Sequence, residues 1–144
     1  MEIRRIRLDE AELVARIYAT EYAPGVEVGR IVPWLQNCAL HPRAFCLVAA
    51  EDGEIAGFVI ASQMTSEVQP GEGGELVELH VRDPRRRDEV GRALVETAIA
   101  SLVRRGSWVV LVSVDRDAPD EERTFWRSLG FEHHVDRFAL YHDD

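Results

Sequence analysis

The stretch VELHVRDPRRRDEVGRALVETAIASLVRRG, from Val77 to Gly106, constrains the fold more than the rest of the chain. It opens with an apolar run of strand character, which ends at Asp83-Pro84. Three arginines follow, and apolar residues then recur at helical spacing as far as Leu102, with Gly106 as a typical helix end. A strand that passes through a short loop into an amphipathic helix is a building unit of α/β folds. We therefore expect a strand here, followed by a helix that packs on the sheet.

Length and charge narrow the class of protein. The chain has 144 residues, of which 46% are hydrophobic, and this predicts one folded domain over residues 1–144. A net charge of −9 argues against binding to nucleic acid or to an anionic membrane. No apolar run is long enough for a membrane span, and the N-terminal residues lack the apolar centre of a signal peptide. These features predict a cytoplasmic protein.

The other elements alternate between strands and helices. Residues 3–8 (IRRIRL) alternate with period two, and residues 45–64 contain two apolar runs joined by Asp52-Gly53, a hairpin signal. Prolines and glycines in residues 22–44 predict short helical pieces between breaks. We also expect a loop over 65–74, a strand over 107–114, a helix over 120–130 and two last strands around Val135. This order predicts an α/β domain with a mixed central sheet of about six to seven strands, flanked by about four helices.

Two of these stretches resemble the GNAT superfamily of acetyl-CoA-dependent N-acyltransferases. The first is LHVRDP at 79–84 with the following Arg86–Leu94, which is similar to the family's strand, pyrophosphate loop and helix. The second is FWRSLGF at 125–131, which is similar to the family's aromatic-x-x-x-Gly-Phe segment. The resemblance covers nearly the whole chain. It implies a GNAT-like fold and acetyl-CoA, or coenzyme A, as the bound cosubstrate.

The loop after the first of these strands is the expected site of the pyrophosphate. A helix N-terminus offers free N–H donors and the positive end of the helix dipole, and both favour phosphate. The family's loop reads Arg/Gln-x-x-Gly-x-Gly/Ala; Arg86 and Gly91 match it, but Glu89 stands where the first glycine belongs. Alternatively, Asp88 and Glu89 simply stabilise the first helical turn and the arginines form a solvated turn. The residues that the resemblance implies for coenzyme A binding are Leu79, His80, Val81, Arg86, Arg87, Asp88, Glu89, Val90, Gly91, Arg92 and Trp126.

The strand before this loop carries a candidate catalytic carboxylate. Alternation in GELVELHV puts Leu76, Glu78 and His80 on one face. A carboxylate on a covered strand face needs a partner or a task. In GNAT-like proteins this strand often supplies a base that takes the proton of the substrate amine, commonly through water, and the resemblance implies this role for Glu78. The alternatives are an exposed strand edge or an ion pair with a nearby arginine, and Glu75 is a second candidate base.

One feature of the family is missing. Many members have a tyrosine at the first aromatic position of the second stretch, where its phenol protonates the departing coenzyme A thiolate. Here the position holds Trp126, whose indole N–H donates a hydrogen bond but is not an acid. The other interpretation of Trp126 is a core side chain. Cys38 and Cys46 are expected to be reduced packing residues, and the five histidines show no ligand spacing, so no metal site is expected.

These observations predict an N-acetyltransferase that transfers an acetyl group from acetyl-CoA to a primary amine by direct attack in a ternary complex. The acceptor is expected to be a small-molecule or peptide amine, selected by residues 18–40 and 66–74. The alternative is a catalytically degenerate GNAT-fold module that binds acyl-CoA or a protein partner without turnover, which Glu89 and Trp126 favour. Nucleic-acid binding is a poor third interpretation, because the arginine cluster is brief and the chain is acidic. The oligomeric state is not fixed by the sequence, and a homodimer is compatible with it.

Overall fold

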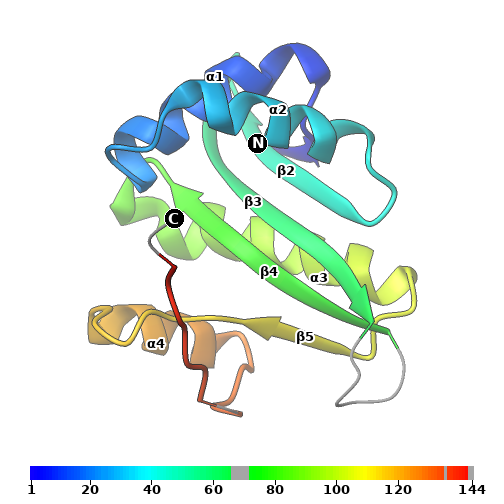
Figure 1. Cartoon of the computed structure of the whole chain (residues 1–144), viewed down its shortest axis with the longest axis vertical. Coiled ribbons are helices and arrows are strands. Elements are labelled where there is room, and N and C mark those ends of the chain that lie inside the picture. The colour runs from blue at the N-terminus through cyan, green and yellow to red at the C-terminus, as the bar shows by residue number, and fades with distance from the viewer. Residues whose placement is uncertain (66–71, 135, 143–144) are drawn as a thin grey trace. The chain divides into compact units, whose positions relative to one another are not determined.

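The computed structural model describes residues 1–65, 72–134 and 136–142 of the chain. These residues form a five-stranded sheet in the order β1-β2-β3-β4-β5 (Figure 1). Neighbouring strands are antiparallel from β1 to β4, whereas β5 is parallel to β4. The strands are β1 (Glu2–Arg5), β2 (Ala44–Glu51), β3 (Glu54–Thr65), β4 (Glu72–Val81) and β5 (Val109–Val112). The mixed α/β class is confirmed, although the described residues contain fewer strands than the six to seven expected.

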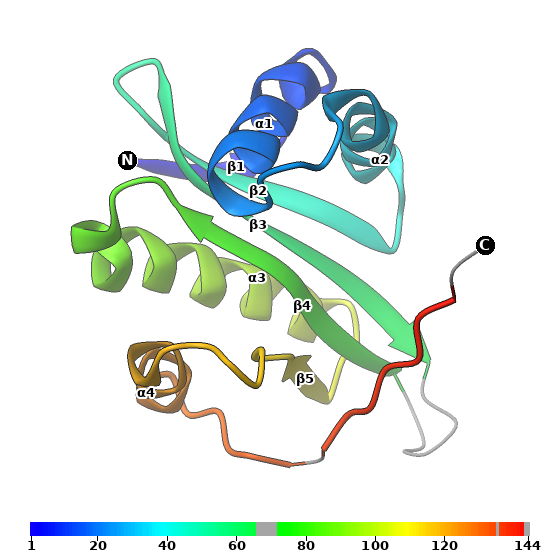
Figure 2. The same cartoon turned by 60° about the vertical axis from the view of Figure 1, so that its left-hand side comes forward.

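The chain divides into two compact units, Met1–Ser113 and Val114–Asp144. Within the first unit, two helices lie on one side of the sheet and one long helix lies on the other side, as Figure 2 shows. The helices of the first unit are α1 (Ala11–Ile17), α2 (Val28–Leu40) and α3 (Arg92–Arg104), and the second unit contains α4 (Asp120–Ser128). Four helices agree with the number expected from the sequence.

The face of the sheet beneath α1 and α2 is closed by alternate residues of β2 and β3. Cys46 and Val48 of β2 and Phe58 and Ile60 of β3 are buried in one apolar cluster with residues of α1 and α2. Cys38 of α2 belongs to the same cluster, and both cysteines are free and buried. Burial raises the pKa of both thiols. The expectation that the cysteines are reduced packing residues is therefore confirmed.

The opposite face is covered by the helix that the apolar stripe predicts. Leu94, Val95, Ala98 and Leu102 of α3 are fully buried. Two glycines permit close packing on this side. A Cβ atom at Gly74 of β4 would lie 2.8 Å from Cδ1 of Leu102, and one at Gly57 of β3 would lie 2.6 Å from the backbone oxygen of His80. The contact at Gly57 is with backbone, so that position needs glycine, whereas a side chain at Gly74 would require the Leu102 side chain to shift.

The β2–β3 hairpin turns where its sequence predicts. Asp52 and Gly53 connect the two strands with φ angles of 52° and 79°. Two successive residues with positive φ are typical of the type I′ turn, which matches the right-handed twist of the flanking strands. The turn carries Glu51 and Glu54 at its two ends, and it thereby places three acidic side chains, those of Glu51, Asp52 and Glu54, at one end of β2 and β3.

The segment before β2 is more regular than its prolines and glycines predict. Instead of short helical pieces, residues 28–40 form one helix, α2, with Pro33 inside it. Proline removes one backbone hydrogen bond, and its ring crowds the carbonyl of the residue four positions earlier, which is Gly29. Ile31, Leu35 and Cys38 recur at helical spacing and are buried, so tertiary packing compensates for the missing bond.

The two strands expected around Val135 are wrong for the described residues 131–134 and 136–142, which have no regular secondary structure; Val135 itself lies outside them. A strand needs a paired neighbour and a buried face, and alternation alone supplies neither. Phe138, Leu140 and Tyr141 are between 82% and 97% exposed, so their side chains have no apolar contact to stabilise a strand. Most of the expected loop over 65–74 also lies outside the described residues, and β4 begins within it at Glu72.

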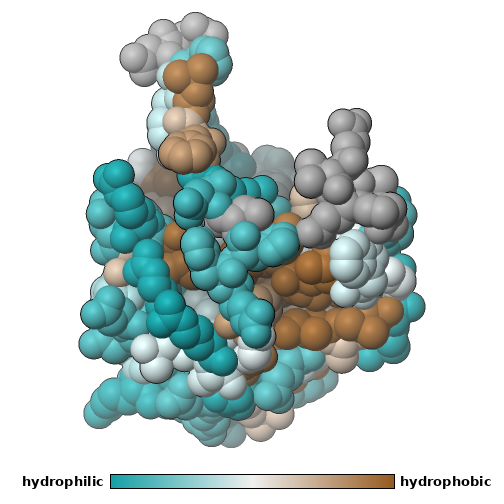
Figure 3. Space-filling model, turned by 90° about the horizontal axis from the view of Figure 1, so that it is seen from below, coloured by the Kyte–Doolittle hydropathy of each residue, from teal (hydrophilic) through white to brown (hydrophobic). Residues whose placement is uncertain are grey.

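The surface agrees with a chain in which 30% of residues are charged. A space-filling view of one face shows hydrophobic side chains among larger hydrophilic areas (Figure 3). Among the helices that the structure describes, none combines the length and the apolar character needed to cross a bilayer.

Candidate active site

The register between β3 and β4 changes by one residue beside the candidate base. Ile60 of β3 pairs with Glu78 of β4, but the next residue of β3, Ala61, pairs with Leu76. Val77 is therefore an extra residue in β4, which is the definition of a β-bulge. Its side chain is 41% exposed, in contrast to the fully packed residues of β3 opposite. Bulges bend a strand and redirect its side chains, so this one affects the position of every later residue in β4.

The bulge corrects the assignment of faces. Uninterrupted alternation predicts Leu76, Glu78 and His80 on one face, and this is wrong for Leu76. Residues paired across a ladder share a face, so Leu76 lies on the α3 side, whereas Glu78 and His80 lie on the side of α1 and α2. Glu75 pairs with Ser62 and so shares the face of Glu78. Both carboxylates considered from the sequence thus lie on the same side of the sheet.

The strands β4 and β5 part at the bulge. Their ladder ends at the pair Leu76–Val112. From Val77 to Val81, β4 continues and pairs with β3 on one side, while no described strand pairs with its other side. Figure 1 shows the two strands diverging beyond this point. An unpaired strand edge presents backbone N–H and C=O groups to an extended ligand.

Glu78 is half-buried and is held by two tyrosines of the first helical segment. The segment η2 (Tyr18–Tyr22) is a π-helical continuation of α1. The Tyr18 hydroxyl donates to Oε1 of Glu78 at 3.4 Å, and the Tyr22 hydroxyl donates to Oε2. Burial raises the pKa of the Glu78 carboxyl, and the hydrogen bonds from Tyr22 and Tyr18 partly oppose this rise. The ion pair with an arginine, considered from the sequence, is not found among the described contacts of Glu78.

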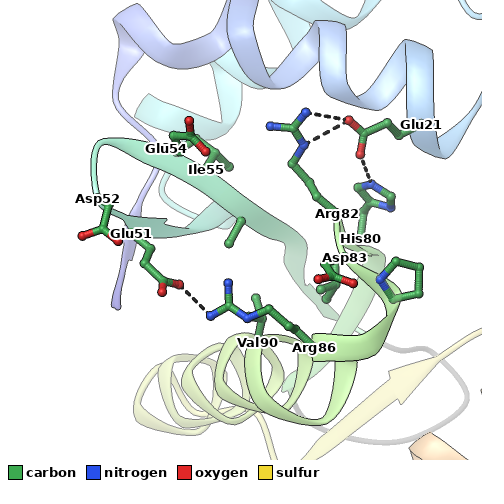
Figure 4. A pocket seen from close by; sticks show the side chains of 13 residues that line it. Glu21, Glu51, Asp52, Glu54, Ile55, His80, Arg82, Asp83, Arg86 and Val90 are labelled. Carbon is green, nitrogen blue, oxygen red and sulfur yellow. Dashed lines mark hydrogen bonds and ion pairs between the residues drawn. The ribbon is translucent and has the colours of Figure 1, made fainter.

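A second polar cluster lies beside Glu78 on the same face. Nε2 of His80 lies 2.9 Å from Oε1 of Glu21, and the Arg82 guanidinium contacts the other oxygen of Glu21 at 2.9 and 3.0 Å (Figure 4). Burial raises the pKa of Glu21, but the hydrogen bonds from His80 and Arg82 and the positive charge of Arg82 leave it lowered overall. Glu21 is therefore ionised and tied to the end of β4.

These residues line a cleft of about 800 Å³ at the end of β4. Figure 4 shows Arg82 and His80 directed toward Glu21, and Arg86 directed toward Glu51 of the hairpin. The lining comes from η2, from the β2–β3 hairpin and from the end of β4 with its loop, and it includes no described residue of β5. The cleft therefore includes His80 and Val81 at the end of β4 but none of the described residues of β5.

The loop after β4 is helical from its first residues. Pro84–Arg86 form a tight turn, η3, and Arg87–Gly91 form a wider π-helical turn, η4, that leads directly into α3. The Asp83 side chain accepts the backbone N–H of Arg85 at 3.1 Å and so caps this run. The helical run therefore begins before the apolar stripe of α3, because the proline and the capping aspartate begin it at its earliest permitted position.

The first arginine of the family motif is paired with two carboxylates. Nε of Arg86 lies 2.7 Å from Glu89, and one terminal nitrogen lies 2.7 Å from Glu51. The hydrogen bonds that Arg86 donates to Glu89 and then to Glu51 raise the pKa of Arg86, and Arg86 in turn lowers the pKa of Glu89. Glu89, at the position of the family's glycine, thus directs its charge at Arg86 in this structure.

The other expected coenzyme A residues fall into two groups. Val90 and Gly91 are buried in the turn that leads into α3. Arg92 forms a long ion pair with Glu96 at 3.8 Å. Those with side chains at least partly open to solvent are Leu79, His80, Val81, Arg86, Arg87, Asp88, Glu89 and Arg92. All of them lie along the end of β4 and the start of the helical run.

Trp126 belongs to the second unit and is 4% exposed. Its indole N–H donates to Glu122 one turn earlier at 3.1 Å, and its ring meets Phe125 and Phe131 edge to face at 5.1 and 5.4 Å. These contacts agree with the interpretation of Trp126 as a packing residue. A role of Trp126 toward coenzyme A stays a prediction.

Several residues of the site are not identified by the sequence analysis. They are Tyr18, Tyr22, Glu21 and Glu51. The one available signal is the i, i+4 spacing of Tyr18 and Tyr22, which places both phenols on one helix face. Their partner lies about sixty positions later, at Glu78, and helical spacing alone does not reveal it. Within the described residues no group of three metal-ligating side chains is found.

Comparisons with solved structures show the same fold. A candidate acetyltransferase from Arthrobacter sp. FB24 has a TM-score of 0.79 and 24% identity, over 100% of this chain and 96% of the other. An aminoglycoside acetyltransferase from an uncultured soil metagenomic sample, in complex with sisomicin, has a TM-score of 0.78 and 17% identity over 99% and 96%. The ribosomal-protein-alanine N-acetyltransferase from Brucella melitensis biovar Abortus 2308 has a TM-score of 0.78 and 17% identity over 99% and 100%. At these identities the likeness establishes the fold.

Sequence comparison establishes the family. A search of curated proteins finds no significant match. The profile of the Acetyltransferase (GNAT) family, in contrast, matches residues 11–131, which is most of the chain and includes β4, the arginine-rich loop, α3 and α4. The two stretches that carry the resemblance therefore stand within one continuous family match, and this chain belongs to the GNAT acetyltransferase family.

Proposed function

We propose that this protein is an N-acetyltransferase that transfers an acetyl group from acetyl-CoA to a primary amine by direct attack in a ternary complex. The observation that supports this most is the position of Glu78, a half-buried carboxylate on β4 next to the point where β4 and β5 part. A proton acceptor and an open strand edge thus lie together. Membership of the GNAT family supports acyl transfer in general.

In this mechanism Glu78 acts as the general base. An amine at neutral pH is protonated and has no lone pair for attack, so a proton must leave before or during the C–N bond formation. The raised pKa of Glu78 suits proton acceptance near neutral pH better than an ordinary carboxylate does. The free amine then attacks the thioester carbonyl of acetyl-CoA, and the thiolate of coenzyme A leaves.

The described residues fit a coenzyme A molecule at the β4–β5 edge. The edge of β4 from Val77 to Val81 offers backbone groups to an extended chain, and the helical run that begins at Pro84 offers N–H donors to phosphate. Arg85, Arg86 and Arg87 add positive charge at the same place. When bound, acetyl-CoA supplies the activated acyl group. We assign to its binding the residues named from the sequence, with Arg86 and Arg87 for the phosphates.

The amine acceptor enters, in this proposal, from the side of α1 and α2, because Glu78 lies on that face. The aminoglycoside and ribosomal-protein enzymes among the similar structures take a small-molecule and a protein acceptor respectively. We propose a small-molecule or peptide amine for this chain as well. The cytoplasmic location, the single domain and a homodimeric state stay predictions from the sequence.

We expect acetyl-CoA to raise the melting temperature of the protein. A ligand bound only by the folded state adds RT ln(1 + [L]/Kd) to stability, about 2.7 kcal/mol at a concentration one hundred times Kd. Differential scanning fluorimetry over a titration of acetyl-CoA measures the effect, and ATP at the same concentrations controls for general phosphate binding. An unchanged melting temperature at millimolar acetyl-CoA would contradict both the enzyme and the acyl-CoA-binding module.

We expect Glu89→Gln to tighten coenzyme A binding by a few-fold. The substitution leaves the helix intact and removes the charge that pairs with Arg86, so the guanidinium becomes more available to phosphate. The gain is modest because the pair is exposed and screened. Isothermal titration calorimetry measures the affinity, with Glu12→Gln as control, since Glu12 pairs with Arg16 on α1 in an exposed ion pair. Weaker binding by the Glu89 variant would mean that Glu89 does not compete with the phosphates.

A second candidate function is a GNAT-fold module that binds acyl-CoA or a protein partner without turnover. Two observations favour it: Arg86 is already satisfied by two carboxylates, and the family's tyrosine is replaced by Trp126. A thiol-release assay with acetyl-CoA and a panel of amines separates the two functions. Acetyl-CoA binding together with coenzyme A release on addition of an amine supports the enzyme, and binding without release supports the module.

A further inference from the structure

The hydroxyl groups that hold Glu78 come from the segment that continues α1. Tyr18 donates to one carboxylate oxygen and Tyr22 donates to the other. An ionised carboxylate has about four acceptor positions, so two phenol hydrogen bonds leave room for the donors of an incoming ammonium group. The arrangement therefore orients the carboxylate without blocking it.

Both phenol rings are fixed by an aromatic cluster. Tyr18 stacks on Phe58 of β3 at 6.1 Å and meets Trp34 of α2 edge to face at 5.9 Å. Tyr22 lies 5.0 Å from Tyr18 and 5.9 Å from His80. Contacts with β3, α2 and β4 thus determine where the two hydroxyls point. Rings held in this way do not need to reorganise when the base works, which is the purpose of a supporting shell around a reactive group.

The two tyrosines differ in exposure and in their tasks. Tyr18 is 8% exposed, and burial and then the charge of Glu78 raise its pKa to about 12. It therefore remains a protonated donor throughout the physiological range. Tyr22 is 36% exposed and lies at the rim, between the buried base and solvent.

We propose that Tyr22, together with Tyr18, is a positioning residue for acetyl transfer, because their hydroxyls hold the Glu78 carboxylate in its ionised, proton-accepting form. The proposal rests on the function proposed above, in which Glu78 is the base. Burial favours the neutral carboxylic acid, which accepts no proton, whereas each phenol donor favours the carboxylate. The tyrosines thus offset part of the effect of burial on the group that must be charged to act.

No other charged group is needed to explain this balance. Around Glu78, β3 contributes Phe58 and Ile60, and α2 contributes Trp34 against Tyr18, none of which ionises. Other titratable or charged groups of the described residues on this face include Cys46, Glu75, His80, Glu21 and Arg82. The last three are bound to one another, and the shift of Glu78 arises from burial and the two tyrosines alone.

The test compares the parent protein with the Tyr22→Phe and Tyr18→Phe variants over a range of pH values. It uses two readouts. The first is the acidic limb of kcat/KM, which reports the base of the free enzyme. The second is a ¹³C NMR titration of glutamate δ-carboxyl groups, in which the Glu78 signal is identified by its loss in Glu78→Gln. Phenylalanine keeps the ring and removes the donor, so packing is preserved. Tyr141→Phe is the matched control, because Tyr141 is 87% exposed and belongs to the second unit.

We expect the midpoint of the acidic kcat/KM limb and the midpoint of the NMR titration to move to higher pH, by about one pH unit for Tyr22→Phe. The shift is of this size because hydrogen bonds to charged groups are stronger than those to neutral groups. The activity of Tyr22→Phe should approach that of the parent at pH values well above the new midpoint, which a purely structural defect would not produce. An unmoved NMR midpoint, or an NMR shift without a shift in kcat/KM, overturns the proposal. Full activity of Glu78→Gln instead overturns the function of Glu78 itself, and the NMR readout distinguishes that result from a failure of the tyrosines.

Discussion

Glu78→Gln should lower kcat by a factor of about 10²–10⁴ and leave the affinity for acetyl-CoA nearly unchanged. The amide retains the shape of the side chain, and its one oxygen can still accept from one of the two phenols, but its NH₂ group only donates and the side chain takes no proton from the ammonium group. Coenzyme A contacts are assigned to the edge of β4 and the helical run, so they are unaffected. Steady-state kinetics with an accepted amine, together with calorimetric titration of acetyl-CoA, measures the two quantities separately.

The matched control is Glu75→Gln on the same face of the same strand. If Glu78 is the base, Glu75→Gln keeps turnover close to that of the parent; the reverse pattern would assign the base to Glu75. Stability provides a second control. The raised pKa of Glu78 means that the folded protein binds this proton more tightly, so stability is lost as pH rises from the ordinary glutamate range through the raised value. The Glu78→Gln protein should therefore be at least as stable as the parent at neutral pH, and a less stable variant would leave unfolding as the cause of its inactivity.

Gly57→Ala should lower the free energy of unfolding by about 1–3 kcal/mol. A Cβ atom at this position would lie 2.6 Å from the backbone oxygen of His80 and 3.3 Å from Cδ1 of Leu94. The first contact is with backbone, so β3 and β4 must separate locally, and α3 limits how far they can move. Chemical denaturation followed by circular dichroism measures the loss.

The control for this substitution has the opposite sign. Gly29 lies in the first turn of α2, and a Cβ atom there would contact nothing within 4 Å. Gly29→Ala should raise the free energy of unfolding by about 0.4–1 kcal/mol, because alanine reduces the freedom of the unfolded chain. If the two substitutions had equal effects, the cost at Gly57 would not arise from its contact with β4.

The parts of the fold that follow from the sequence are those with local signals. The Asp52-Gly53 turn needs only the two residues that adopt positive φ, and the α3 stripe needs only its own spacing. The predictions that are wrong depend on distant partners. Pro33 is accommodated because α2 buries its apolar face on the sheet, and the strands expected around Val135 lack the paired neighbour that residue alternation cannot supply.

The candidate site divides in the same way. Glu78 and Arg86 are found from a motif that is continuous in the chain. The face on which Leu76 lies cannot be found from that motif, because the bulge at Val77 is a property of the register between two strands. The role of Tyr22 cannot be predicted from the sequence for a related reason, because it depends on a hydrogen bond to a residue on another element. Nothing in its own neighbourhood distinguishes it from an ordinary helical tyrosine.

The two cysteines allow transient openings of one half of the core to be measured. Cys38 and Cys46 are the two cysteines of the chain. Both are buried in the apolar cluster between the sheet and the helices α1 and α2, and the α3 side of the sheet has no cysteine. A thiol reagent can modify them only during openings of that half, so the labelling rate of the native protein reports how often it opens. Openings confined to the α3 half leave no trace in the same experiment. Labelling with and without acetyl-CoA would then show whether ligand binding lowers the frequency of openings in the half of the core that lies beside Tyr18, Tyr22 and Glu78.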